Sequence, residues 1–195
     1  MSIYLIRHGQ TDLNAARVIQ FPDTPLSVRG LEQARRVGKR LAGSPIDLVL
    51  SSDYARARQT AEGVVLGTAA PLEFDALLRE RNFGDLRGTA HNSHIEDVFA
   101  EGYAPANGET AEVFHERVAR AWTLVLEVAG RLQRDLAVVT HGLVLNSLMD
   151  RILSLPEDAA QQGWVVENTS LTVVDPAPPY RIGVMACARH LDGMD

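Results

Sequence analysis

A short apolar run that ends in a histidine–glycine pair occurs twice in this chain and constrains the fold more than any other feature. Residues 3 to 11 read Ile-Tyr-Leu-Ile-Arg-His-Gly-Gln-Thr, and residues 136 to 142 read Leu-Ala-Val-Val-Thr-His-Gly. Runs this short and apolar, rich in branched side chains and closed by glycine, are typical of buried strands rather than helices. Gly9 permits the turn that follows the first strand. We therefore expect Arg7 and His8 at the carboxyl end of a central strand, the edge where open α/β sheets bind ligands.

Strand and helix patterns alternate through the rest of the chain. After a loop at about 10–26, we expect a helix from Ser27, a good N-cap, to about Gly43. Its apolar stripe is Val28, Leu31, Ala34, Val37 and Leu41. Further strands are expected at 46–50, 71–74, 170–174 and 181–186, and further helices at 54–66, 110–133 and 143–153. The 110–133 helix carries Val113, Val118, Trp122, Val125, Ala129 and Leu132 on one face, with Trp122 expected in the core.

This alternation predicts a single α/β domain over residues 1–195, a three-layer α/β/α sandwich with a mainly parallel sheet. Residues 82–110 are the least regular stretch, interrupted by Gly84, Gly88, Gly102, Pro105 and Gly108. We expect a short helix there, around Ile95 to Ala100, and a lid-like position over the site. Pro176, Pro178 and Pro179 indicate a turn between the last two strands.

Size and charge narrow the class of protein. A chain of 195 residues suits one domain with a substantial core. A net charge of −6 argues against a nucleic-acid partner, although converging cations can still bind an anion. The single cysteine, Cys187, excludes an intramolecular disulfide. The chain has no leader-like start and no apolar run near the ~20 residues that span a bilayer, so we expect a cytoplasmic protein without a membrane partner.

Polar side chains with complementary chemistry follow four of the expected strands. They are Arg7 and His8 after the first, Arg56 after the second, Glu80 after the third and His141 after the fourth. Two histidines, two arginines and a carboxylate suit phosphoryl transfer, because that reaction needs mainly positioning and positive charge. The alternative for Arg7 and His8 alone is a surface pair after an ordinary strand.

With Arg7-His8-Gly9-Gln10-Thr11 at its start and a second His-Gly pair at 141–142, the chain resembles the histidine phosphatase superfamily, the phosphoglycerate-mutase-like proteins. The resemblance spans nearly the whole chain. It implies that His8 attacks phosphorus and becomes phosphohistidine, and that His141 contacts the phosphoryl oxygens. It also implies that Arg7 and Arg56 grip the phosphate and that Glu80 donates a proton to the leaving group.

The stretch 51–61 sets the register of that comparison. Two serines, then Arg-Ala, then Gln-Thr-Ala match the family pattern and select Arg56 rather than Arg58, which we expect to be solvated. The alternative for Glu80 is a surface carboxylate paired with Arg79 or Arg81.

Further phosphate or hydroxyl contacts are expected from the side chains of Asn14, Gln20 and Thr140. The amides of Gly142 and Leu143 should also face the anion, because they begin a helix.

Two loops depart from the family pattern. Residues 17–23 lack the usual Gln-Gly in register, and Leu86 and Arg87 stand where tryptophan and glutamate are usual. Both loops would line the mouth of the site, which puts the identity of the substrate in doubt. Three arginines near that mouth, Arg79, Arg81 and Arg87, suggest a second anionic group on the substrate.

Other chemistries are less favoured. His91 and His94 have helical spacing for a metal, but no further Cys/His cluster supports it, and solvated loop histidines are the better interpretation. Cys187 lacks the arginine six residues later that a cysteine phosphatase needs, since position 193 is glycine. No phosphate-binding Gly-x-x-x-x-Gly-Lys-Ser/Thr loop and no Gly-x-Ser-x-Gly elbow occur.

The sequence therefore predicts a metal-independent histidine acid-type phosphatase without a cofactor, which releases inorganic phosphate from a small phosphorylated metabolite. Two alternatives stay open: an isomerising phosphoglycerate mutase, and a non-catalytic protein that binds a phosphorylated ligand. Typical mutases carry extra sequence in the region that matches 82–110, where this chain is compact.

Overall fold

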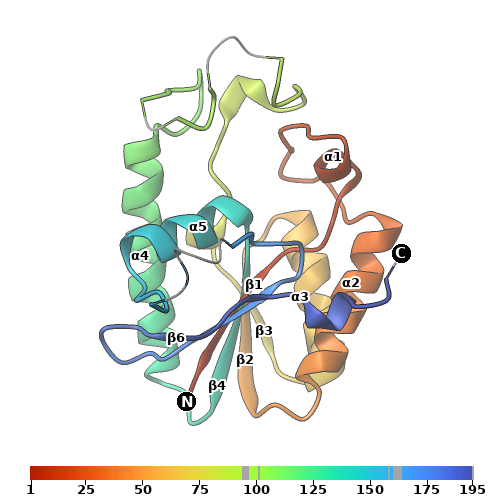
Figure 1. Ribbon diagram of the computed structural model, residues 1–195, viewed down its shortest axis with the longest axis vertical. Coiled ribbons are helices and arrows are strands. Elements are labelled where there is room, and N and C mark those ends of the chain that lie inside the picture. Colours follow the sequence, from red (N-terminus) through yellow and green to blue (C-terminus); the bar gives the residue numbers. More distant parts are fainter. Residues whose placement is uncertain (94–96, 101, 158, 160–163, 195) are drawn as a thin grey trace.

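A six-stranded sheet forms the middle layer of the protein (Figure 1). The computed structural model describes residues 1–93, 97–100, 102–157, 159 and 164–194. The strands are β1 (Ile3–Arg7), β2 (Ile46–Ser51), β3 (Leu72–Phe74), β4 (Asp135–Thr140), β5 (Leu171–Val174) and β6 (Ile182–Cys187). Their order is β3-β2-β4-β1-β5-β6, and the pairs along β3-β2-β4-β1 are parallel, while β5 runs antiparallel to both neighbours. The predicted, mainly parallel sheet is confirmed.

The two strands that end in His-Gly are neighbours at the centre of this sheet. β1 and β4 pair in register from Ile3 with Leu136 to Arg7 with Thr140. The amide of His8 continues the ladder by donating to the Thr140 carbonyl at 2.9 Å. His8 and His141 therefore leave the sheet side by side.

Helices cover both faces of the sheet, as predicted (Figure 1). They are α2 (Val28–Leu41) and α3 (Ala55–Thr68) on one face, and α4 (Ala111–Ala129) and α5 (Gly142–Arg151) on the other. Side chains alternate along each strand, so Leu5 packs in the core beneath α4 and α5, while Ile6 packs beneath α2 and α3. Trp122 lies in the α4 core, as expected.

The buried face of α2 differs from the predicted apolar stripe. The side chains of Val28 and Leu31 are 87% and 48% exposed. The rest of the predicted stripe, Ala34, Val37 and Leu41, is buried as expected, and Gly30, Gln33 and Gly38 complete the buried face. The physical reason is close backbone packing: a Cβ on Gly38 would lie 2.0 Å from the carbonyl oxygen of Gly63 in α3. Val113 in α4 is likewise exposed, because the helix turns Ala111 and Phe114 inward instead.

The ends of several elements also differ from the predictions. A short helix α1 (Asp12–Ala15) occupies the predicted loop and begins at a capping box between Thr11 and Asn14. The helix expected over 110–133 ends at Ala129, and single 3₁₀ turns occur at η1 (Ala76–Leu78), η2 (Gly84–Leu86) and η3 (Arg189–Leu191). Of the helix expected at 95–100, the first part lies outside the described residues, and 97–100 forms a turn.

The described parts of 82–110, here called the roof, lie beyond the carboxyl ends of the central strands (Figure 1). One bridge joins the roof to the loop after α1, between Val18 and Ala90. Within the described chain, no helix is both long enough and apolar enough to cross a membrane.

Candidate active site

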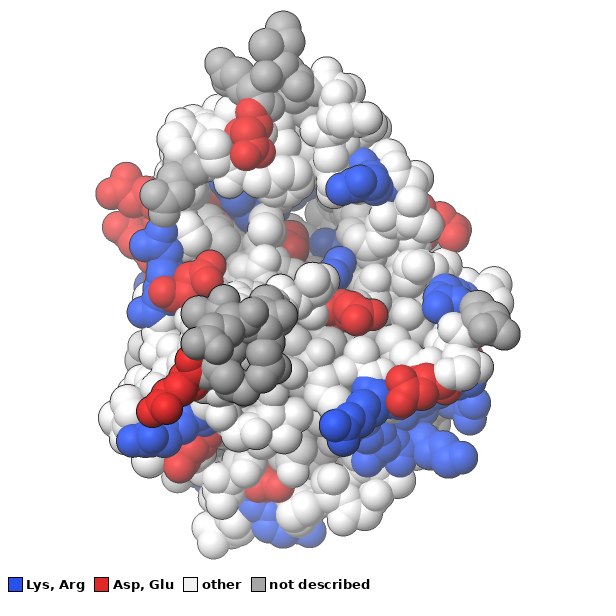
Figure 2. Space-filling model, viewed as in Figure 1, with Lys and Arg blue, Asp and Glu red and all other residues white. Residues whose placement is uncertain are grey.

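The five residues expected to carry the chemistry converge at the carboxyl edge of the sheet. Arg7, His8, Arg56 and Glu80 line one cavity of about 530 Å³, which the roof partly covers. His141 is fully buried behind them, with its ring centroid 5.1 Å from that of His8. Figure 2 shows the hollow below the roof, with basic and acidic side chains visible inside it.

His8 is held as a neutral imidazole with one unprotonated nitrogen. Its ring is 2% exposed, and Nδ1 lies 2.7 Å from the carbonyl oxygen of Gly9. Because a carbonyl oxygen only accepts, Nδ1 must carry the proton and Nε2 must keep its lone pair. Arg56 Nε donates to that Nε2 at 3.3 Å. Burial, and then the charges of Arg56 and Arg7, hold the His8 pKa well below its ordinary value, so the nucleophilic form prevails near neutral pH.

Two desolvated guanidinium groups line the same cavity as this nitrogen. Arg56, in the first turn of α3, donates from Nη1 to the Phe21 carbonyl at 2.9 Å, and burial lowers its pKa to about 10, so it remains a cation. Arg7 donates from Nη1 to the Val166 carbonyl at 2.6 Å, whereas its buried Nε has no hydrogen-bond partner in the described chain. A Cβ at Gly142 would lie 3.5 Å from that Nε, so glycine keeps its surroundings open. Buried cations with donors to spare suit an anion.

His141 is neutral too and is oriented by a serine. Its Nε2 lies 2.9 Å from Ser52 Oγ, which also accepts the Tyr54 amide at 3.3 Å. When the Ser52 hydroxyl donates its proton to Nε2, the imidazole proton lies on Nδ1. This Nδ1 is buried without a partner among the described residues and is a donor in that tautomer. Burial, followed by Arg56 and His8, holds the His141 pKa well below its ordinary value.

Glu80 has the environment of a carboxylic acid rather than of a surface ion pair. Its Oε1 accepts the Arg81 amide at 3.0 Å and its Oε2 accepts the Leu143 amide at 3.3 Å. Burial raises its pKa, and the main opposing influence is the charge of Arg56. The Leu143 amide, expected to face the anion, is thus engaged by Glu80.

The arginines near the mouth have different partners. Arg79 forms its ion pair with Asp53, away from Glu80. Arg81 is 5% exposed and donates to the carbonyls of Glu109 and Tyr103. Within the described part of the chain, only Arg87 of the three has a guanidinium group with neither a hydrogen bond nor an ion pair, and it lines the cavity. The alternative that pairs Glu80 with Arg79 or Arg81 is therefore wrong.

The remaining expected contacts divide into two groups. Asn14, Gln20 and Gly142 line the cavity, and Gln20 accepts a hydrogen bond from the Thr11 hydroxyl at 2.7 Å. Thr140 does not line it, because its hydroxyl is buried and donates to the Leu78 carbonyl at 2.7 Å.

Sequence reasoning missed several supporting residues. The Asn168 amide donates to the His8 carbonyl at 2.9 Å, and the Thr60 hydroxyl accepts the Gly9 amide at 2.9 Å. Asn168 follows no strand in the sequence, so no local signal marked it. His91 is exposed, as expected, and it also lines the cavity from the roof. Across the described residues, no group of three or more His, Cys, Asp or Glu side chains could hold a metal, and His94 lies outside those residues.

Comparisons with known proteins identify the family and the fold. The sequence profile of the histidine phosphatase superfamily (branch 1) matches residues 3–181. The probable phosphoglycerate mutase GpmB of Citrobacter koseri is 33% identical over an alignment of 213 residues, covering 98% of this chain and 95% of the relative. The structure of Bacillus stearothermophilus YhfR has a TM-score of 0.84 at 29% identity and covers 98% of this chain and 99% of its own. That of the α-ribazole phosphatase from Shigella flexneri has a TM-score of 0.81 at 27% identity, covering 96% and 97%. This chain belongs to the histidine phosphatase superfamily.

Proposed function

We propose that the protein hydrolyses small phosphomonoesters through a phosphohistidine on His8, without a metal ion. The observation that carries this proposal is the hydrogen bonding of His8: the Gly9 carbonyl binds Nδ1–H, and Nε2 keeps its lone pair next to the Arg56 guanidinium group, in a cavity that Arg7 also lines.

The reaction divides into two steps. In the first, His8 Nε2 forms a bond to phosphorus as the bond to the substrate oxygen breaks, and Glu80 gives that oxygen its proton. In the second, water attacks the phosphohistidine, Glu80 recovers a proton from it, and inorganic phosphate leaves. Arg7, Arg56 and His141 stabilise the negative charge that spreads over the phosphoryl oxygens in both steps.

Hydrolysis is favoured over isomerisation by the shape of the site. A mutase must keep the dephosphorylated alcohol in place until it takes the phosphoryl group back. The cavity of about 530 Å³ opens to the surface below a compact roof (Figure 2), which gives water access to the site. The competing candidate comes from the relatives called probable phosphoglycerate mutases. With 3-phosphoglycerate as substrate, the release of inorganic phosphate supports the hydrolase, and formation of 2-phosphoglycerate supports the mutase.

The nucleophile is tested by trapping the intermediate. We expect acid-labile, base-stable phosphate on the protein during turnover of 4-nitrophenyl phosphate, and its loss in His8→Ala. His190→Gln removes a partly buried histidine that does not line the cavity and should retain the label, which makes it the matched control. Full activity in His8→Ala would contradict the proposal.

Metal independence is tested by chelation. The two arginines supply the positive charge that a metal would otherwise bring. Activity should survive prolonged dialysis against EDTA. Loss of activity that a divalent ion restores would instead favour a metal at His91 and His94.

A further inference from the structure

Glu80 lies on an irregular stretch between η1 and η2, outside any helix or strand. A proton donor needs a fixed position, since misplacement of the order of 1 Å can cost about 10²-fold in rate. The structure shows what holds this stretch: an ion pair between Arg117 of α4 and Glu109, which precedes that helix. Both side chains are largely buried, with exposures of 12% and 16%.

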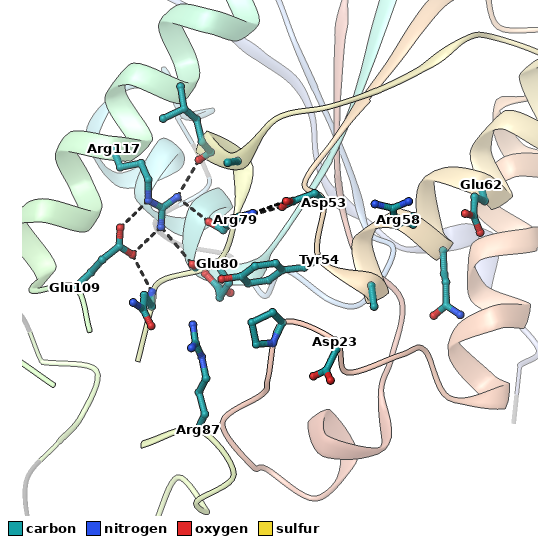
Figure 3. Close-up of a pocket in the computed structure, with 16 residues that line it drawn as sticks. Asp23, Asp53, Tyr54, Arg58, Glu62, Arg79, Glu80, Arg87, Glu109 and Arg117 are labelled. Atoms are coloured by element: carbon teal, nitrogen blue, oxygen red, sulfur yellow. Dashed lines mark hydrogen bonds and ion pairs between the residues drawn. The ribbon is translucent and has the colours of Figure 1, made fainter. Parts of the chain in front are cut away.

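Every N–H of the Arg117 guanidinium group is used. Nε and Nη2 donate to the two carboxylate oxygens of Glu109 at 2.7 and 2.8 Å. Nη1 donates to the carbonyls of Leu77 and Arg79 at 2.9 and 2.8 Å, and Nη2 also donates to the carbonyl of Glu80 at 3.2 Å. Figure 3 shows Arg117 reaching from α4 between Glu109 and the irregular stretch that carries Glu80.

Glu109 holds the same stretch from its other side. Its Oε2 accepts the Asn82 amide at 2.8 Å, and its main-chain carbonyl accepts from Arg81 Nε at 3.1 Å. The pair thus contacts the main chain on both sides of Glu80 without touching its carboxyl group.

We propose that Arg117 and Glu109 are positioning residues, which fix the main chain of Glu80 and cancel each other's charge beside its carboxyl group. This inference rests on the proposed role of Glu80 as a proton donor. A single guanidinium group at this place would also order the chain, but it would favour the ionised carboxylate, which cannot donate. The paired carboxylate removes that conflict.

The other groups that face Glu80 are accounted for. Arg56 from α3 and Arg7 from β1 lower its pKa, while burial raises it and prevails. Tyr54 and Arg87 lie along the walls of the cleft that also contains the pair (Figure 3). Arg81 donates its amide to the carboxyl group, and its guanidinium charge also interacts with Glu80. His8 and His141 are neutral. Removing one partner of the pair therefore adds a net charge that the others do not already compensate.

Two substitutions should move the titration of Glu80 in opposite directions. Glu109→Gln leaves Arg117 uncompensated and should lower the pKa of Glu80, whereas Arg117→Gln leaves Glu109 uncompensated and should raise it. Phenyl phosphate expels phenolate, a poor leaving group that needs a proton donor. The alkaline limb of its kcat/KM–pH profile should therefore move to lower pH in Glu109→Gln and to higher pH in Arg117→Gln. In both variants, phenyl phosphate turnover should fall at least tenfold, because a positioned acid contributes a rate factor of ~10²–10⁴. Turnover of 4-nitrophenyl phosphate should fall by less than threefold.

Controls separate positioning from general damage. Asp47→Asn removes the carboxylate of the Arg134–Asp47 ion pair, which has the same 2.7 Å contact and also accepts main-chain amides, but lies at the opposite edge of the sheet. It should leave both pH profiles unchanged. Arg117→Lys keeps the positive charge but loses the paired N–H donors of the guanidinium group. It should therefore slow phenyl phosphate turnover without moving the alkaline limb of the pH profile. The inhibition constant of inorganic phosphate should stay within twofold of the wild-type value in every variant, because Arg7 and Arg56 are unchanged.

The titration of the Glu80 carboxyl group by ¹³C NMR gives the same answer without turnover. Opposite shifts in the two glutamine variants support the inference, and shifts of the same sign, or none, overturn it. Absence of phosphohistidine in the wild-type protein would instead overturn the proposed function, and the two failures are therefore distinguishable.

Discussion

At the scale of single residues, the role of each arginine is decided by its partners. The sequence places Arg79, Arg81 and Arg87 near the mouth of the site, and all three could bind an anion. Their partners lie far away in the sequence: Asp53 for Arg79, and the Glu109 carbonyl for Arg81. Motif spacing identified Arg7, His8, Arg56, Glu80 and His141, because the chemistry needs those residue types after strands. Hydrogen-bond partners of this kind have no local signal, so they could not be predicted.

The raised pKa of Glu80 leads to a prediction about leaving groups. Glu80→Gln keeps the shape of the side chain and removes its transferable proton. We expect single-turnover phosphohistidine formation to slow by ~10²–10⁴ with alkyl phosphates, which expel a poor leaving group, and far less with 4-nitrophenyl phosphate. Single turnover is required because Glu80 also serves the water in the second step. Equal losses on both substrates would mean that Glu80 binds or positions instead.

At the scale of elements, the strands were easier to predict than the helix faces. A buried strand needs little more than a run of branched apolar side chains. The strands at 3–7 and 135–140 carry such side chains toward both faces of the sheet. The face of α2 was predicted correctly at Ala34, Val37 and Leu41 but wrongly at Val28 and Leu31, because the helix packs on α3 through glycine. An apolar stripe predicts a helix face that buries large side chains. Where two helix backbones lie in close contact, there is no room for side chains, and glycine stands there instead. Val28 and Leu31 therefore looked buried and are not.

The contact between α2 and α3 is tested by Gly38→Ala. Alanine favours a helix by about 1 kcal/mol over glycine, but its Cβ would lie 2.0 Å from the Gly63 carbonyl oxygen, so steric overlap should win. We expect the free energy of unfolding to fall by about 1–3 kcal/mol, measured by urea titration. Gly183→Ala in β6 is the control, because the nearest atom to its Cβ would be 4.0 Å away. A Gly38→Ala protein as stable as the wild type would contradict the packing described.

At the scale of the whole molecule, the site couples stability to pH. His8 and His141 are buried and neutral, with pKa values held well below the ordinary 6.5. As the pH falls through about 6.5, the unfolded chain takes up protons at these histidines and the folded chain does not. Stability should therefore be complete above this pH and decline below it. Glu80 acts in the opposite direction, since its pKa is raised on folding.

Urea titrations at pH 7.5 and pH 5.0 measure this coupling. The free energy of unfolding should be lower at pH 5.0, and His8→Gln should show a smaller decrease, because glutamine does not titrate. Each pKa unit by which a histidine is shifted corresponds to about 1.4 kcal/mol. The same decrease in both proteins would show that His8 is not responsible.

The hydrogen bond from His8 to the carbonyl of the very next residue has an evolutionary consequence. The hydrogen bond between His8 and Gly9 alone determines which ring nitrogen is reactive. The roof comes from a stretch more than seventy residues away in the chain. Nucleophile and recognition surface can therefore drift independently. A chimera that carries the 83–108 segment of a relative, and so keeps Asn82 and Glu109, should acquire a new substrate preference and still form phosphohistidine, so a lineage built on this scaffold can diversify its substrates without reinventing its chemistry.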